Sequence, residues 1–239
     1  MHRSECNFSD RIKDPDVSQR VPPRESLAEL ESTDPELRLR LREPCRADAA
    51  EIWSLVAGRD ELDVNSPYAY LLMCTDFSET GLVARRIEDD PRTEGELVGF
   101  VLGYRPPKTP EALFVWQIAV APSLRGEGMG SRMLSVLFDR CQANLSVDHL
   151  EATVTPSNLA SRTLFTRFAR ERSAPIEETV AFRSSDFPVS PEPSSPESHP
   201  GPGSDSNPGS PGPTAIRSEG EPHEDEIRLR IGPVGRSVG

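Results

Sequence analysis

A glycine-rich loop between a strand pattern and a helix pattern constrains this chain more than any other feature. Residues 113–121 are apolar enough for a buried strand, Pro122 ends the run, and 125–130 read RGEGMG before a helical pattern at 131–142. Glycines let the backbone approach an anion, and the first N–H groups of a helix lie at the positive end of its dipole. The segment therefore predicts a phosphate or pyrophosphate site.

The spacing of this loop separates it from the two commonest nucleotide motifs. It reads Arg-Gly-x-Gly-x-Gly, which is neither the Gly-x-Gly-x-x-Gly of dinucleotide sites nor the phosphate loop with its Gly-Lys-Ser/Thr. Residues 125–130 contain no lysine. The pattern alone leaves two interpretations, an anion site of another family or a tight strand-to-helix turn that binds nothing.

Strand and helix patterns alternate through the middle of the chain. They predict strands at 37–42, 81–88, 96–104, 113–121, 149–155 and 225–231, and helices at 46–58, 68–77, 131–142 and 157–172. A helix between two strands implies a crossover, so 113–121 and 149–155 should be parallel neighbours. We expect an α/β fold with a mixed sheet flanked by helices, and a ligand where these two strands part.

The two long segments outside this pattern are unsuited to a core. Residues 1–36 are charged and lack periodicity, and residues 188–222 are mainly Pro, Ser, Gly and acidic. Neither can bury enough apolar surface to offset its ordering entropy, so we expect a disordered extension and a disordered insertion around one domain at 37–187. Residues 223–239 should return to the sheet as a last strand with a short tail.

Composition narrows the possible partners. The net charge of −12 argues against nucleic acid, whose binding depends on clustered Lys and Arg. Four scattered cysteines, without a CxxC pair, indicate reduced thiols and no metal site. The sequence has no signal-peptide core and no apolar run of about 18 residues, so we expect a cytoplasmic protein without a membrane partner.

Five segments carry a resemblance to a known family. The Arg-Gly-x-Gly-x-Gly element after Val-Ala-Pro resembles the acetyl-CoA loop of the GCN5-related N-acetyltransferases. Within that family, five runs are similar, in order and wording, to the L-2,4-diaminobutyrate N-acetyltransferases of ectoine biosynthesis. They are LDVNSPYAYLLMC (62–74), VGFVLGYRPP (98–107), TPEALFVWQIAVAPSLRGEGMG (109–130), LEATVTPSNLASRTLF (150–165) and HEDEIRLRI (223–231). The resemblance covers most of 37–187 and the last strand, and implies the acetyltransferase fold and a homodimer.

The resemblance also implies which residues hold acetyl-CoA. A backbone N–H near a bulge of the central strand, at Ala119 or Val120, would contact the thioester oxygen, and Asn158 would lie beside the pantetheine arm. The implied set is Ile118, Ala119, Val120, Arg125, Gly126, Gly128, Met129, Gly130, Ser131 and Asn158. One position departs from the family: Phe165 stands where many relatives have a tyrosine that protonates the leaving thiolate, and phenylalanine has no such proton.

The implied substrate pocket consists of Asp63, Tyr68, Trp116, Glu151 and His223, of which Glu151, Asp63 and His223 are the catalytic candidates. Two carboxylates suit a diamino acid, because one ammonium group can be held while the other amine reacts, and a carboxylate inside a sheet needs a partner. Glu151 is the first choice for the general base, directly or through a water. His223 is the alternative, because imidazole titrates near neutrality.

Simpler structural roles exist for several of these residues. They are an Asx turn for Asp63, core packing for Trp116, and a solvent-exposed position for His223. Ser157, taken alone, is a good N-cap for the helix that follows it. Arg105 is a further candidate, as partner of a substrate carboxylate.

The activity implied by the resemblance is acetylation of L-2,4-diaminobutyrate, at the γ-amine, to N-acetyl-diaminobutyrate for ectoine biosynthesis under osmotic stress. Composition and spacing alone would stop at a CoA-binding α/β domain. Two rival functions remain. One is acetylation of another small amine, such as a polyamine, a peptide N-terminus or an aminoglycoside, and the other is an acetyl-CoA-binding regulatory module without turnover, which Phe165 keeps open.

Overall fold

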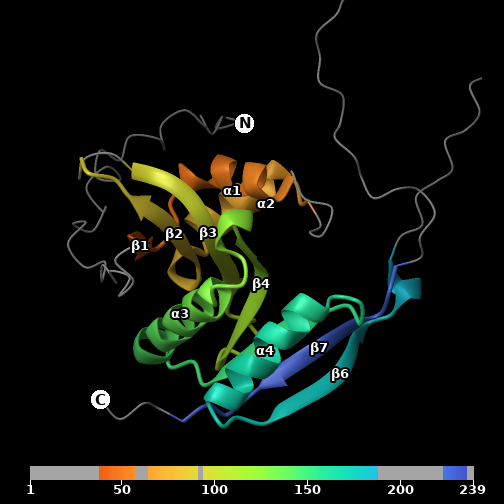
Figure 1. Ribbon diagram of the computed structural model, residues 1–239. Coiled ribbons are helices and arrows are strands. Elements are labelled where there is room, and N and C mark those ends of the chain that lie inside the picture. Colours follow the sequence, from red (N-terminus) through yellow and green to blue (C-terminus); the bar gives the residue numbers. More distant parts are fainter. Residues whose placement is uncertain (1–37, 58–63, 91–93, 188–222, 236–239) are drawn as a thin grey trace, which may run out of the picture.

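One mixed sheet of seven strands organises the computed structural model, which describes residues 38–57, 64–90, 94–187 and 223–235 (Figure 1). The strand order is β1-β2-β3-β4-β5-β7-β6. The strands are β1 (Leu39–Arg42), β2 (Leu82–Ile87), β3 (Glu94–Tyr104), β4 (Ala112–Val120), β5 (His149–Val154), β6 (Ile176–Phe182) and β7 (Glu226–Ile231). All neighbours are antiparallel except β4 and β5, which are parallel as their crossover predicts.

Two pairs of helices cover the two faces of this sheet. They are α1 (Asp48–Ala57), α2 (Pro67–Thr75), α3 (Met129–Leu145) and α4 (Leu159–Glu171). α3 and α4 pack Leu137, Phe138 and Phe168 into one core cluster, while α1 and α2 pack Ile52 and Tyr70 into a second cluster. Because each pair of helices packs on its own core cluster, the central strands between the pairs are buried on both faces. This confirms the mixed sheet flanked by helices that the sequence predicts.

A β-bulge in β4 sets the geometry at the centre of the sheet. Gly103 of β3 pairs with Val115, but the next residue, Leu102, pairs with Gln117, so Trp116 is the extra residue on β4. A bulge bends its strand and increases its twist. The parallel pairing of β4 with β5 ends at the same level, with Val115 opposite Ala152 as the last pair within the described residues. The two strands therefore part directly after the bulge.

The strand that comes last in the sequence lies inside the sheet. β7 pairs with β5 through Glu151–Arg230 and with β6 through Glu177–Arg230, so it separates two strands that precede it in the chain. Residues 1–37, 188–222 and 236–239 fall outside the described part, and the disorder expected for 1–36 and 188–222 therefore stays a prediction.

A buried ion-pair network attaches α1 to the β1–β2 edge of the sheet. Asp48 has no exposed surface, and its carboxylate accepts hydrogen bonds from Arg42 (2.7 and 2.8 Å), Arg85 (2.7 and 3.1 Å) and the Cys45 N–H (2.7 Å). Arg85 also donates to Glu51 at 2.6 Å. Burial by itself raises the pKa of Asp48, but the hydrogen bonds from Arg42, Cys45 and Arg85 outweigh it and lower the pKa to about 2.

This shift predicts acid sensitivity. Because the pKa of Asp48 is lower in the folded chain than its usual 3.8, its stabilisation is complete above about pH 4 and is lost as the pH falls through 2. The free energy of unfolding, measured with urea, should fall by about 2 kcal/mol from this group between pH 5 and pH 2. The Asp48→Asn variant should be less stable at pH 5. Its free energy of unfolding should also lack the pH-dependent loss that comes from Asp48. An unchanged pH dependence in the variant would contradict the assignment.

Candidate functional site

The glycine loop leads into α3 with a left-handed backbone. Gly126 has a φ of 84° and Gly128 a φ of 74°, a region that costs other residues about 1–2 kcal/mol. Gly128 is the N-cap of α3 and offers no side chain to cap it, and a Cβ added at either glycine would meet nothing within 4 Å. The first N–H groups of α3 have no partner within the helix. The loop thus combines open space with N–H donors, as an anion site requires.

The end of β4 lies against this loop and contributes backbone rather than polar side chains. Ile118 and Val120 pack on the α3 and α4 side, and a Cβ at Gly130 would lie 3.8 Å from Val120 and 4.0 Å from Ile118. Ala119 packs on the opposite face of the sheet. Met129 is 5% exposed and its side chain belongs to the core. The structure therefore brings the expected cofactor residues of β4 and of the loop together where β4 and β5 part.

The start of α4 differs in one detail from the sequence prediction. Asn158 is the N-cap, and its side-chain oxygen accepts from the Ser161 N–H at 3.0 Å. The N-cap assigned to Ser157 is wrong, because its N–H and hydroxyl both donate to the Glu224 carboxylate, at 3.1 and 2.8 Å. Phe165 on the same helix is 2% exposed within the core. Its ring is a packing element with no polar atom.

Glu151 lies on the face of the sheet opposite to α3 and α4, where it contacts two arginines. Only 1% of the residue is exposed, and its two carboxylate oxygens meet different arginines of β7. Oε1 accepts from Arg230, and Oε2 contacts Arg228 at 3.4 Å. Arg230 also donates to Glu111 at 2.9 Å. Burial lowers the pKa of the Arg230 guanidinium, but its hydrogen bonds with Glu111 and Glu151 raise it overall. The partner that the sequence requires for this buried carboxylate is thus arginine.

Trp116, the bulged residue, lies in an aromatic contact that the sequence did not reveal. Its ring centroid is 5.5 Å from that of Tyr70, which is fully buried. The Tyr70 hydroxyl donates to the Gln117 side chain at 2.9 Å and accepts from the Asn65 N–H at 3.4 Å. Tyr68, the tyrosine expected in the pocket, is 71% exposed on another side of α2. Apolar residues at helical spacing from Tyr70 were the available signal for its burial.

Of the remaining expected site residues, His223 is not next to Glu151 in one chain. His223 is exposed and stacks on Phe187, with centroids 4.5 Å apart. It precedes Arg230, the cross-strand neighbour of Glu151, by seven residues, and at about 3.3 Å per residue this places it roughly 20 Å away. Asp63 falls outside the described residues. Arg105 donates to the Pro110 carbonyl at 2.9 Å and so supports the turn before β4.

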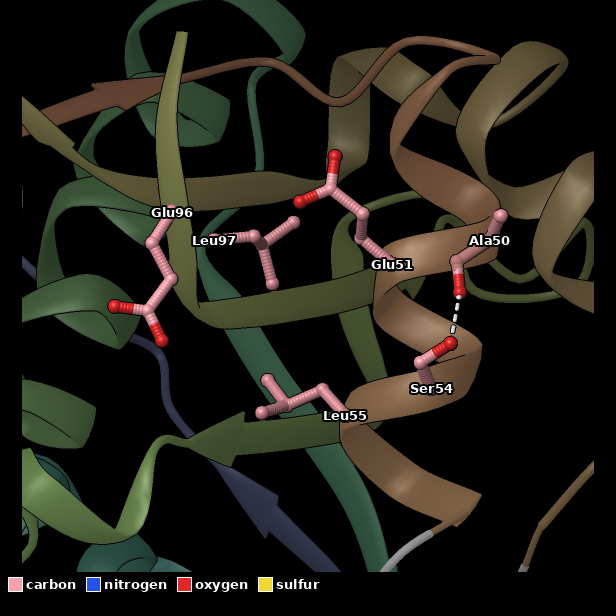
Figure 2. A pocket seen from close by; sticks show the side chains of 6 residues that line it. All are labelled: Ala50, Glu51, Ser54, Leu55, Glu96 and Leu97. Carbon is pink, nitrogen blue, oxygen red and sulfur yellow. Dashed lines mark hydrogen bonds between the residues drawn. The ribbon is translucent and has the colours of Figure 1, made fainter.

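A surface hollow lies between α1 and β3, and none of these residues lines it (Figure 2). Its lining is Ala50, Glu51, Ser54, Leu55, Glu96 and Leu97. The Ser54 hydroxyl donates to the Ala50 carbonyl at 2.9 Å, and Glu51 is bound to Arg85. Because the polar groups at its rim serve the helix and the ion-pair network, the hollow offers no reactive group.

The described residues contain neither a cluster of metal-ligating side chains nor a membrane-spanning helix. No group of three or more His, Cys, Asp or Glu side chains in this part of the chain is placed to hold a metal ion. No helix that the structure describes is long and apolar enough to cross a membrane.

Comparisons with known proteins agree with this arrangement. The family model described as "Acetyltransferase (GNAT) family" matches residues 44–169. The L-2,4-diaminobutyric acid acetyltransferase of Streptomyces coelicolor is 37% identical over 82% of this chain and 94% of its own length, and that of Nocardia farcinica is 43% identical over 62% and 72%. The diaminobutyrate acetyltransferase EctA from Paenibacillus lautus, solved with L-2,4-diaminobutyric acid and coenzyme A, is 33% identical, with a TM-score of 0.63 over 85% of this chain and 99% of its own.

The two tyrosines of α2 give a test of the site as described. Tyr70→Phe removes the buried hydroxyl that joins α2 to Gln117 of β4, and should lower the free energy of unfolding by about 1 kcal/mol. Tyr68→Phe removes an exposed hydroxyl and should change it by less than about 0.5 kcal/mol. Urea unfolding of both variants measures the difference. Equal effects would mean that Tyr70 does not make this hydrogen bond.

Proposed function

The chain belongs to the acetyltransferase (GNAT) family, and from this we propose that it transfers the acetyl group of acetyl-CoA to L-2,4-diaminobutyrate. The product is N-acetyl-diaminobutyrate, acetylated at the γ-amine, for ectoine biosynthesis. The observation that carries this proposal is the joint match in sequence and structure to diaminobutyrate acetyltransferases, over 82% and 85% of this chain.

The glycine loop and the start of α3 are the proposed site for the CoA phosphates. Gly126, Gly128 and Gly130 let the backbone come close, and the N–H groups of Met129, Gly130 and Ser131 lie at the positive end of the helix. Arg125, exposed beside the loop, adds a positive charge. Asn158 at the start of α4 is the proposed contact of the pantetheine arm.

The parted edge of β4 is the proposed place for the thioester. The described pairing of β4 with β5 ends at Val115, so beyond the bulge the edge of β4 at Ile118 and Ala119 can bind a ligand in place of a strand. A backbone N–H of Ala119 or Val120 donates to the thioester oxygen, where negative charge develops in acyl transfer. CoA bound here supplies the acetyl group as a thioester.

Two carboxylates are the proposed selectors of a diamino acid. Glu151 accepts from one ammonium group of the substrate, and Asp63 from the other, while Trp116 and Tyr68 shape the pocket. Arg228 and Arg230 hold the Glu151 carboxylate from the β7 side.

The route of the proton completes the proposal. Glu151 is the proposed general base, directly or through a water, and His223 the alternative, although in one chain His223 is not beside Glu151. Because Phe165 is buried and has no hydroxyl, another group or water protonates the leaving thiolate. A regulatory module that binds acetyl-CoA without turnover is the second candidate, favoured by this same residue.

We also propose a homodimer in the cytoplasm that acts under osmotic stress. β6 is the outer strand of the sheet, and six of its seven residues are exposed, among them Val180 (52%) and Phe182 (49%). Proteins normally cover an unpaired edge with exposed apolar side chains, which supports association of two chains. Light scattering should give twice the chain mass of 26.3 kDa.

The activity is tested by thiol release from acetyl-CoA with a panel of amines: L-2,4-diaminobutyrate, ornithine, lysine, spermidine and a peptide. We expect turnover of diaminobutyrate at least tenfold above the others, with the acetyl group located at the γ-amine by NMR. Preference for another amine would contradict the substrate assignment. Binding of acetyl-CoA without turnover of any amine would favour the regulatory module.

The loop assignment has its own test. Gly128→Val places a β-branched residue at a φ of 74° and fills the open space above the loop, so acetyl-CoA affinity in calorimetry should fall at least tenfold. Ser146→Val is the matched control, because Ser146 has a φ of 57° at the other end of α3. Both variants should lose thermal stability, and only the first should lose affinity. A normal affinity for Gly128→Val would remove the loop from the cofactor site.

A further inference from the structure

A row of side chains crosses four strands at the level of Glu151. Phe114 of β4 is opposite Glu151 of β5, Glu151 is opposite Arg230 of β7, and Arg230 is opposite Glu177 of β6. Cross-strand partners point to the same face of a sheet. Arg230 therefore lies between two acidic residues on its own row, and its direct contacts are with Glu151 and, through its second terminal nitrogen, with Glu111 at 2.9 Å.

The two oxygens of Glu151 are held differently. Oε1 accepts the hydrogen bond of Arg230, whose side chain is 26% exposed. Oε2 has the longer 3.4 Å contact with Arg228, whose side chain is 39% exposed. Arg228 is opposite Thr153, one residue past the last β4–β5 pair. Oε2 is thus turned toward the part of the sheet where β4 and β5 separate, and Oε1 away from it.

We propose that Arg230, itself fixed by Glu111, is a positioning residue that anchors Oε1 of Glu151 and leaves Oε2 as the oxygen that accepts the substrate ammonium group. This rests on the proposed function. Arginine suits the role because its planar guanidinium can bridge two carboxylates with separate N–H donors, which the single ammonium of lysine cannot do in the same geometry. A buried carboxylate without such an anchor would favour its neutral form, in which it attracts no ammonium group.

The charged groups around Glu151 define what a pH profile would report. Arg228 and Arg230 contact Glu151 from β7. Glu111, directly before β4, is bound to Arg230, and Glu177 of β6 is the cross-strand neighbour of Arg230. His149 is on the same face of β5, two residues earlier, and its Nδ1 lies 2.6 Å from Asp148. Of these groups, Arg230 alone contacts both Glu111 and Glu151.

The test compares Arg230→Met with wild type in the pH dependence of kcat/KM for diaminobutyrate. We expect the acidic limb of the profile to move to higher pH and kcat/KM at pH 7 to fall at least tenfold, with the KM for acetyl-CoA unchanged. Arg230→Lys should keep the limb nearer to wild type and still lose activity, because the charge remains and the bridge does not. An acidic limb at the wild-type position in Arg230→Met would overturn the proposal.

Arg162→Met is the matched control. Arg162 joins α4 to Glu178 of β6 by an ion pair of similar exposure, 31% for the arginine side chain, and is not in contact with Glu151. It should lower the melting temperature and leave the pH profile unchanged. If Arg162→Met moves the limb as far as Arg230→Met does, the effect is structural and the proposal fails. Should Arg230→Met not fold, Glu111→Gln releases the outer contact of Arg230 and should shift the limb in the same direction by a smaller amount.

A second readout does not depend on turnover. With glutamate labelled by ¹³C at the carboxyl carbon, the Glu151 resonance is assigned through its loss in Glu151→Gln. Its chemical shift at pH 7 should differ between Arg230→Met and wild type, because the hydrogen bond from Arg230 to Oε1 is lost. If the wild-type protein acetylates no diamino acid, the proposed function fails while this comparison still decides whether Arg230 anchors Glu151. An identical chemical shift in both proteins would overturn that role.

Discussion

The parting of β4 and β5 is the constraint on which the rest of the site depends. Two parallel strands are hydrogen-bonded through four residue pairs and then separate at Trp116, where β4 carries one residue more than β3. Backbone groups that a continuous sheet would use internally become available to a ligand. Three proposed parts of the site lie around that opening: the glycine loop at the end of β4, Asn158 after β5, and Glu151 on the opposite face.

Local patterns predicted most of the architecture, and long-range contacts account for what they missed. The strand and helix periods placed the four helices and six of the seven strands within a few residues, because amphipathic patterns reflect which face is buried. They did not predict β6, whose residues are almost all exposed and so do not form a buried face. The bulge at Trp116 depends on the register between β3 and β4, which no local pattern encodes. Likewise, Ser157 and Asn158 are equally good caps in sequence, and the choice follows from Glu224, a residue of the distant β7 segment that binds Ser157.

Local patterns also could not identify the long-range partners of polar side chains on the buried sheet faces. Alternation correctly put Glu151 on a defined face and predicted a partner for it, but not that the partner would be arginine from the last strand. Tyr70 was not singled out from the sequence, although apolar residues at helical spacing indicate its burial, because its hydrogen bond with Gln117 is a long-range contact. The position of Asp63 remains a prediction, because it falls outside the described residues.

The place of β7 between β5 and β6 has a consequence for how the chain is made. β6 pairs with β7 and with no other described strand, so neither β6 nor the outer edge of β5 can be satisfied until residues 226–231 have left the ribosome. Contacts that span so much sequence slow folding, and exposed strand edges in the meantime favour association with other chains. Completion of the sheet and anchoring of Glu151 are therefore one event, which must wait for the synthesis of β7.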